Sequence, residues 1–100
     1  MKFYHATTPD IAVKIRKEGI IKQSVDGVVY LCKTPEDACK FVYIRGHKEI
    51  TVICVELDED EVQESFDHNE KFFGCKAYYY EGSIVLDDSK HVSIQQFSYL

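Results

Sequence analysis

Short apolar runs separated by polar segments follow one another along this chain, and their spacing changes from helical to strand-like. The first helical segment has an apolar stripe at Ile11, Ala12 and Ile15. It begins at the capping sequence Thr-Pro-Asp of residues 8–10, where Thr8 is expected to cap the free amides. Gly19 follows the stripe and is typical of a helix end. These signals predict a first helix that reaches Gly19.

The same capping chemistry occurs a second time. Thr34 and Asp37 stand at the spacing of a capping box, with a proline between them. Phe41 and Val42 continue the buried face of the predicted helix, and Gly46 is expected to close it. We interpret the two similar starts as convergent capping and not as an internal repeat.

The remaining apolar segments have the composition of strands. Residues 50–57 are β-branched and apolar on both faces, which predicts a central strand. Residues 76–81 form a further strand, in which three consecutive tyrosines must point to both faces. Residues 83–86 either continue that strand or pair with it across Gly82, and residues 91–95 form a final strand. The polar segment 62–69 gives no clear pattern.

The predicted helices come early in the chain and most strands come late. This order favours an α+β domain over a doubly wound parallel sheet. We therefore expect residues 1–100 to form a single domain with a compact split, mostly antiparallel β-sheet and two helices in its N-terminal half. No Gly-rich dinucleotide fingerprint or phosphate-binding loop is present in the sequence.

Composition narrows the possible functions. The chain is 45% hydrophobic and 13% aromatic, as expected of a globular protein. Its net charge of −5 makes general nucleic-acid binding an unfavourable interpretation, because neutralising phosphates requires clustered Lys and Arg. The apolar runs are far shorter than the roughly 20 residues that span a bilayer. The first residues lack signal-peptide character, so we expect a cytoplasmic protein without membrane partners.

The sequence has four cysteines, Cys32, Cys39, Cys54 and Cys75, and none forms a CxxC pair. The histidines show no zinc-ligand spacing either, so no metal site is expected. In the cytoplasm these thiols should be reduced. Cys54 lies in an apolar run and is expected in the core. Cys32 directly follows Tyr30 and Leu31 and could approach a cleft there, although a catalytic thiolate needs a base or a positive neighbour.

His5 and Tyr30 carry the candidate chemistry. Each lies at the end of a short apolar run, just before a helix-start signal. Side chains at the point where a strand turns into a helix are well placed to line a cleft. In a chain of 100 residues, two such positions are expected to lie close together.

The residues around these positions are similar to the motifs of one enzyme class. The chain has His5-Ala6-Thr7-Thr8, then Gly19, then the segment Gly-Val-Val-Tyr-Leu at 27–31, then Ala38. This order resembles ADP-ribosyltransferase-like domains of the His-Tyr-Glu type, which include the RNA 2′-phosphotransferases and the diphtheria-toxin-like enzymes. The resemblance covers roughly the first 45 residues.

The resemblance implies a site for NAD between two small sheets. By position His5 would bind the adenosine-side ribose, backbone groups beside it would hold the nicotinamide amide, and Tyr30 would stack on the nicotinamide ring. Ala6 and Thr7 are expected to contact the cofactor, Thr7 through its hydroxyl or its backbone. Glu81 is the candidate for the catalytic carboxylate, with Glu56 second. The family's usual Glu-x-Glu or Gln-x-Glu pattern is absent, and basic residues for a 2′-phosphate have no counterpart that we can place.

The expected function is therefore transfer of ADP-ribose from NAD to an unknown acceptor, and each residue has an alternative interpretation. His5 could satisfy backbone groups at a strand end, Tyr30 could be a core aromatic, and Glu81 could be a solvated hairpin residue. The alternative for the whole chain is a catalytically inactive domain of the same fold that acts as an interaction or inhibitor module. The run Tyr78–Tyr80 favours that alternative, because tyrosine is enriched at interface hot spots.

Overall fold

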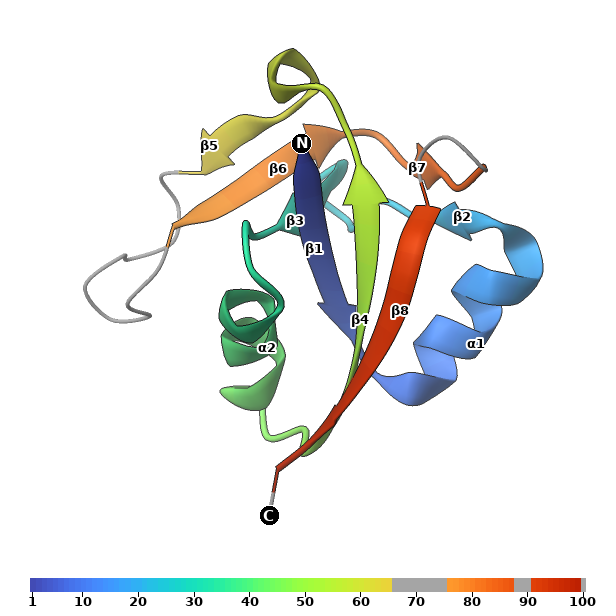
Figure 1. Ribbon diagram of the computed structural model, residues 1–100, viewed down its shortest axis with the longest axis vertical. Coiled ribbons are helices and arrows are strands. Elements are labelled where there is room, and N and C mark those ends of the chain that lie inside the picture. The colour runs from blue at the N-terminus through green and yellow to red at the C-terminus, as the bar shows by residue number, and fades with distance from the viewer. Residues whose placement is uncertain (66–75, 88–90, 100) are drawn as a thin grey trace.

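The computed structural model describes residues 1–65, 76–87 and 91–99, whose helices and strands are arranged as Figure 1 shows. The helical elements are α1 (Pro9–Glu18), α2 (Pro35–Tyr43) and the short 3₁₀ helix η1 (Glu59–Glu61). The strands are β1 (Lys2–Thr7), β2 (Ile20–Ile21), β3 (Val28–Leu31), β4 (Glu49–Glu56), β5 (Gln63–Ser65), β6 (Ala77–Glu81), β7 (Ile84–Val85) and β8 (His91–Ser98). The paired strands are antiparallel, so the expected α+β fold with two helices in the N-terminal half is confirmed.

A three-stranded sheet in the order β1-β4-β8 forms the larger part of the molecule. At its centre Ile53 of β4 pairs with His5 on β1 and with Ile94 on β8. All residues of β4 from Ile50 to Val55 are buried, which confirms that this segment is a central strand with two apolar faces. The register between β4 and β8 shifts at Cys54/Val55, so β8 is not paired uniformly along its length.

A second three-stranded sheet has the order β3-β6-β5, and a two-stranded ladder joins β2 to β7. Residues 83–86 were expected to continue the strand of residues 76–81 or to pair with it. Both expectations were wrong, because β7 pairs with β2 and not with β6. The chain changes direction at Gly82, whose φ of 87° suits a residue without a Cβ. The Gly82 N–H donates to the carbonyl of Gly27, 2.8 Å away, next to the Val28–Glu81 pair of the β3–β6 ladder.

The two helices begin as the sequence predicts, but only one has a side-chain cap. In α2, the Thr34 hydroxyl oxygen accepts a hydrogen bond from the Asp37 N–H at 3.1 Å. In α1, Thr8 occupies the N-cap position without such a bond. Gly19 ends α1 in the left-handed conformation with φ 71°, as expected. α2 ends at Tyr43, and Gly46 closes a turn after it and not the helix itself.

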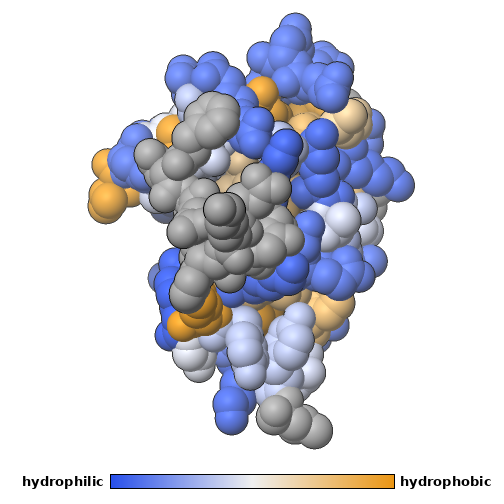
Figure 2. Space-filling model, turned by 90° about the vertical axis from the view of Figure 1, so that its left-hand side faces the viewer, coloured by the Kyte–Doolittle hydropathy of each residue, from blue (hydrophilic) through white to orange (hydrophobic). Residues whose placement is uncertain are grey.

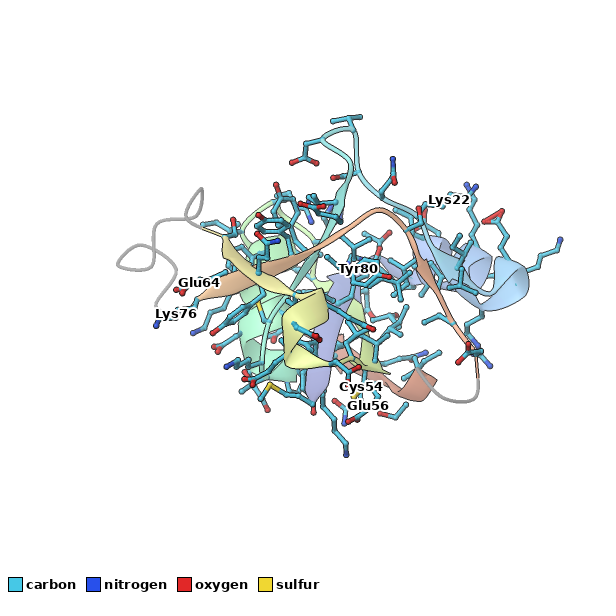
Figure 3. The ribbon with its side chains drawn as sticks, turned by 90° about the horizontal axis from the view of Figure 1, so that it is seen from above. Lys22, Cys54, Glu56, Glu64, Lys76 and Tyr80 are labelled. Carbon is cyan, nitrogen blue, oxygen red and sulfur yellow. The ribbon has the colours of Figure 1, made fainter. Side chains whose placement is uncertain are left out.

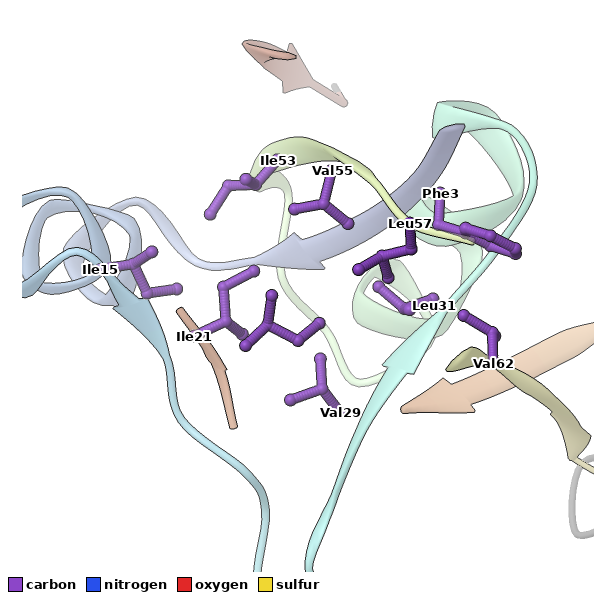
Figure 4. Packing of buried hydrophobic residues seen from close by; sticks show 10 residues of the cluster. Phe3, Ile15, Ile21, Val29, Leu31, Ile53, Val55, Leu57 and Val62 are labelled. Atoms are coloured by element: carbon purple, nitrogen blue, oxygen red, sulfur yellow. The ribbon is translucent and has the colours of Figure 1, made fainter. Parts of the chain in front are cut away.

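Apolar side chains pack on both faces of the β1-β4-β8 sheet. One cluster fills the space between this sheet, the second sheet and α1, and Figure 4 shows its side chains interleaved. It consists of Phe3, Ile15, Ile21, Val29, Leu31, Ile53, Val55, Leu57, Val62 and Ile84. The other cluster lies beneath α2 and consists of Cys39, Val42, Ile50 and Val52, with Tyr4, Ala6, Phe97 and Tyr99 packed against it. Cys54 is also buried, as expected.

The surface is polar where the structure describes it. On the face that Figure 2 shows, hydrophilic residues predominate and hydrophobic colour is confined to small separate areas. The apolar side chains that are exposed include Val13, Val25 and Val85, which come from different elements. Scattered exposed apolar residues of this kind are usual for a globular protein.

Candidate functional site

Strands β1 and β3 form the two walls of a cleft. They meet at Tyr4 and Cys32, which exchange backbone hydrogen bonds of 2.8 and 2.9 Å. Beyond this bridge the strands separate, and the next contact between them is made by a side chain. The His5 Nδ1 lies 3.0 Å from the Tyr30 carbonyl oxygen. We call the space between residues 4–6 and 28–32 the β1–β3 cleft.

The β1–β3 cleft holds a pocket of about 390 Å³, which is within the size range of small-molecule sites. Most of its lining is apolar and comes from β3 and from α2. A few polar side chains are placed among these residues, which is the usual composition of a ligand site. The lining consists of Tyr4, His5, Ala6, Lys22, Ser24, Val28, Val29, Tyr30, Leu31, Cys32, Ala38, Phe41, Val42, Ile44, Arg45 and Ala77.

Three of the residues expected from the sequence therefore lie together: His5, Ala6 and Tyr30 all line the pocket. Thr7 does not line the pocket, and its expected role as a cofactor neighbour stays a prediction. Its side chain is 7% exposed, and it pairs with Thr51 on β4. Side chains alternate along a strand, so Ala6 and Thr7 point to opposite faces. Thr7 shares its face with His5, and of these two side chains His5 lines the pocket.

The alternation of hydrogen bonds places the backbone of Ala6 in the cleft. Tyr4 uses its N–H and C=O to bond Cys32, so these groups point away from β4. In an antiparallel ladder every second residue has this orientation. The N–H and C=O of Ala6 therefore also point toward the β1–β3 cleft. One donor and one acceptor side by side can bind a primary amide.

His5 is neutral at pH 7 and has a defined tautomer. Burial and the nearby positive charge of Arg45 lower its pKa from the ordinary value of 6.5, and the bond to Tyr30 opposes this only in part. A carbonyl oxygen can only accept a hydrogen bond, so the proton is on Nδ1 and Nδ1 donates to Tyr30. The Nε2 atom then has a lone pair, which can accept a hydrogen bond from a ligand hydroxyl.

Glu81 lies beside the cleft without lining it. It pairs with Val28, and Tyr30 pairs with Tyr79. Directly paired residues, and residues two apart on a strand, project to the same face of a sheet. Glu81 is thus on the same side as Tyr30 and is its diagonal neighbour, about 7–8 Å away along the sheet. The Glu81 side chain is exposed, and no Asp or Glu occurs among the described lining residues.

Glu56, the second choice for a carboxylate, is occupied elsewhere. Its Oε1 accepts a hydrogen bond at 2.8 Å from the amino group of Met1. In Figure 3 it lies next to Cys54, on the opposite side of the molecule from Lys22, which lines the pocket. Glu56 therefore does not lie near the β1–β3 cleft.

The pocket is also lined by two cationic side chains, and the sequence did not reveal their role there. Arg45 follows the end of α2, and its Nε donates to the Phe41 carbonyl oxygen at 3.1 Å. Lys22 enters from the segment after β2 and also forms an ion pair with Glu18 at 3.3 Å. A lining with two cations and no carboxylate, in a chain of net charge −5, favours an anionic ligand. An arginine just after a helix gives no sequence signal beyond a solvated helix end.

The thiols of the described part of the chain are buried. Cys32, Cys39 and Cys54 are buried and form no disulfide with one another, and Cys75 lies outside the described residues. Burial raises the pKa of Cys39 and of Cys54, which disfavours their thiolates. Within residues 1–65, 76–87 and 91–99, no cluster of three His, Cys, Asp or Glu side chains could hold a metal ion.

The three consecutive tyrosines are largely engaged within the protein. Tyr78 packs edge-on against Phe3 with ring centroids 6.0 Å apart, and Tyr80 packs against the same apolar cluster. The Tyr79 hydroxyl donates to Gln63 on the neighbouring strand at 2.7 Å. Their contacts therefore explain much of the tyrosine run without a protein partner.

Comparison with known proteins identifies no relative. No family model, no curated protein and no solved structure matches the chain. In the part of the chain that the structure describes, neither α-helix has the length and apolar character needed to cross a membrane.

Proposed function

We propose that the protein binds NAD in the β1–β3 cleft and transfers its ADP-ribose group to an acceptor. The observation that carries this proposal is the contact of His5 with Tyr30 across the cleft, where the His5 Nδ1 lies 3.0 Å from the Tyr30 carbonyl. These are the two residues through which the sequence resembles ADP-ribosyltransferase-like domains. Their meeting in one pocket supports the resemblance independently of the motif order.

The lining offers partners for the nicotinamide, a ribose and the pyrophosphate of the dinucleotide. The backbone N–H and C=O of Ala6 would bind the nicotinamide amide, and the Tyr30 ring would stack on the nicotinamide. The unprotonated Nε2 of His5 would accept a hydrogen bond from a ribose hydroxyl. Arg45 and Lys22 are the cations available for the pyrophosphate. NAD supplies the activated glycosidic bond to nicotinamide.

Glu81 is the carboxylate that we assign to the chemical step. When the bond to nicotinamide breaks, positive charge develops on the ribose, and a nearby carboxylate stabilises it. Glu81 shares a sheet face with Tyr30, so rotation of its exposed side chain would bring the carboxylate toward a ligand stacked on that ring. The acceptor, whether protein, nucleic acid, small molecule or water, is left open by the site.

Calorimetric titration with NAD tests the binding proposal. We expect wild type to bind and the His5→Ala/Tyr30→Ala double variant to lose most of the heat. His47→Ala is a matched control, because His47 is exposed and does not line the pocket. Equal heats for wild type and the double variant would overturn the proposal, provided that circular dichroism shows both to be folded.

A second candidate is favoured by one observation: the described lining contains no carboxylate. This second candidate is a non-catalytic domain that would bind NAD or a related anionic nucleotide without turning it over. Nicotinamide release separates the two candidates. Binding without release above the buffer rate, unchanged by Glu81→Gln, would favour the non-catalytic domain.

We include a cytoplasmic location in the proposal. The described cysteines are thiols, as is usual in a reducing compartment. A fusion to a fluorescent protein in the native host tests the location.

A further inference from the structure

A tight turn stands at the mouth of the β1–β3 cleft, directly before β3. The Gly27 N–H donates to the Ser24 carbonyl at 2.9 Å, and Gly27 has a φ of 82°. The Ser24 N–H donates to the Val28 carbonyl at 2.9 Å. This turn is therefore tied to the first residue of the strand that carries Tyr30, and Ser24 and Val28 both line the pocket.

Asp26 of this turn contacts the functional tyrosine. Its Oδ2 accepts a hydrogen bond from the Tyr30 hydroxyl, and its Oδ1 accepts one from the Ser24 hydroxyl. Hydrogen bonds to a carboxylate are stronger than those between neutral groups. Because the two oxygens bind different partners, the carboxylate cannot rotate without losing one of them.

Tyr30 is consequently held at both ends. Its backbone carbonyl accepts a hydrogen bond from His5 at 3.0 Å, and its hydroxyl is held by Asp26. A phenol ring attached only at its Cβ turns readily about its side-chain torsions. A ring fixed at both ends presents one face to the cleft before any ligand arrives.

We propose that Asp26 is a positioning residue, which fixes the Tyr30 ring in the orientation that stacks on the ligand. This inference rests on the proposed NAD site but concerns a residue that the family resemblance does not assign. A ring ordered in advance costs less to immobilise on binding, and this saving is worth about two- to tenfold in affinity for one side chain. Asp26 acts through Tyr30 and need not touch the ligand.

The first test needs no ligand. In protein labelled with ¹³C at the tyrosine Cζ, the Tyr30 signal is assigned by its loss in Tyr30→Phe. We expect Asp26→Ala to shift this signal, because the phenol loses its carboxylate partner. Asp26→Asn keeps an acceptor oxygen but loses the charge, so we expect a smaller shift than in Asp26→Ala. Asp60→Ala, an exposed acid on η1, is the control and should leave it unchanged. An unshifted Tyr30 signal in Asp26→Ala would overturn the inference.

The second test is a cycle of NAD affinities for wild type, Asp26→Ala, Tyr30→Phe and the double variant. We expect Asp26→Ala to weaken binding about two- to tenfold, Tyr30→Phe to do the same, and the double variant to be no weaker than Tyr30→Phe. If Asp26→Ala weakens binding equally in the Tyr30→Phe background, Asp26 acts by another route and the inference fails. Absence of NAD binding by wild type would refute the proposed function and the ligand part of this inference, whereas the Cζ shift would still decide whether Asp26 fixes the ring.

Discussion

Tyr4 and Cys32 join the two three-stranded sheets through a reciprocal pair of backbone hydrogen bonds of 2.8 and 2.9 Å. On one side of this bridge the side chains belong to the shared apolar core. On the other side β1 and β3 separate and leave room for a ligand. The bridge therefore fixes the position at which the β1–β3 cleft begins.

Glu81→Gln tests the chemical step. It keeps the size of the side chain and removes its charge, so NAD affinity should change little. Turnover should fall by a factor of hundreds, as expected when an electrostatic partner of the transition state worth roughly 3–4 kcal/mol is lost. The measurement is nicotinamide release at saturating NAD.

The control for this prediction is Glu61→Gln, a substitution at an exposed position on η1 that does not line the pocket. Equal turnover by wild type and Glu81→Gln would remove Glu81 from the mechanism.

Arg45→Gln should weaken NAD binding by about three- to tenfold, because a partly solvated cation contributes on the order of 1 kcal/mol to binding an anion. Added salt should reduce the difference between variant and wild type. The substitution should also raise the pKa of His5, since the charge of Arg45 is one of the causes that lower it. Calorimetry and a histidine NMR titration measure the two effects.

Arg16→Gln is the matched control, because Arg16 lies on α1 in a different surface depression. If both variants lose affinity equally, the effect comes from net charge and not from the site.

The lowered pKa of His5 should make the stability of the protein depend on pH in a specific way. Its pKa in the folded protein is lowered from 6.5, so below that value the unfolded chain binds a proton that the folded chain does not. The contribution to stability is complete above pH 6.5 and is lost as the pH falls toward the folded pKa. His5→Gln lacks this contribution, so the stability difference between wild type and variant should shrink from pH 7.5 to 5. Urea unfolding at a series of pH values measures it, and a constant difference would contradict the prediction.

Two matched substitutions, one at each N-cap, test whether the side-chain cap stabilises α2 more than α1. Thr34→Ala removes the hydroxyl that accepts from the Asp37 N–H and should lower the free energy of unfolding by about 1 kcal/mol. Thr8→Ala should cost less, because Thr8 makes no side-chain cap. Equal losses in urea unfolding would mean that the Thr34 bond contributes nothing.

Ile53→Ala probes the shared core. Ile53 is 0% exposed at the centre of β4, so the substitution should lower the free energy of unfolding by about 2–5 kcal/mol. Val85→Ala is the control, because Val85 is 59% exposed and should cost less than about 0.5 kcal/mol. A small loss at Ile53 would mean that the core relaxes around the cavity.

The sequence predicts those elements whose signals are local and repeated over several residues. The cap at Thr34, the end of α1 at Gly19 and the central strand around Ile53 are of this kind. The pairing of Ile20–Ile21 with Ile84–Val85 could not be predicted in this way. Two-residue strands have too little pattern to indicate a partner more than sixty positions away.

The residues of the candidate site also differ in whether the sequence could reveal them. His5 and Tyr30 could be found because they end apolar runs at motif-like spacing. Alternation alone puts Thr7 on the same face as His5, so the absence of Thr7 from the pocket lining depends on tertiary packing and could not be read from the pattern. Arg45 could not be found, because its approach to the pocket depends on how α2 packs against β1, and this packing is a tertiary feature.

The walls of the cleft have a consequence for how the protein is made. β1 pairs with β4, and β3 pairs with β6, whose residues 77–81 are synthesised much later. The first 45 residues thus contain nearly all of the recognisable motif but cannot form the pocket, because β1 and β3 lack the strands with which they pair until β4 and β6 emerge from the ribosome. A truncated chain would expose unpaired strand edges and be prone to aggregate. The β1–β3 cleft is therefore a late product of folding, although the sequence of its two walls is among the first to be translated.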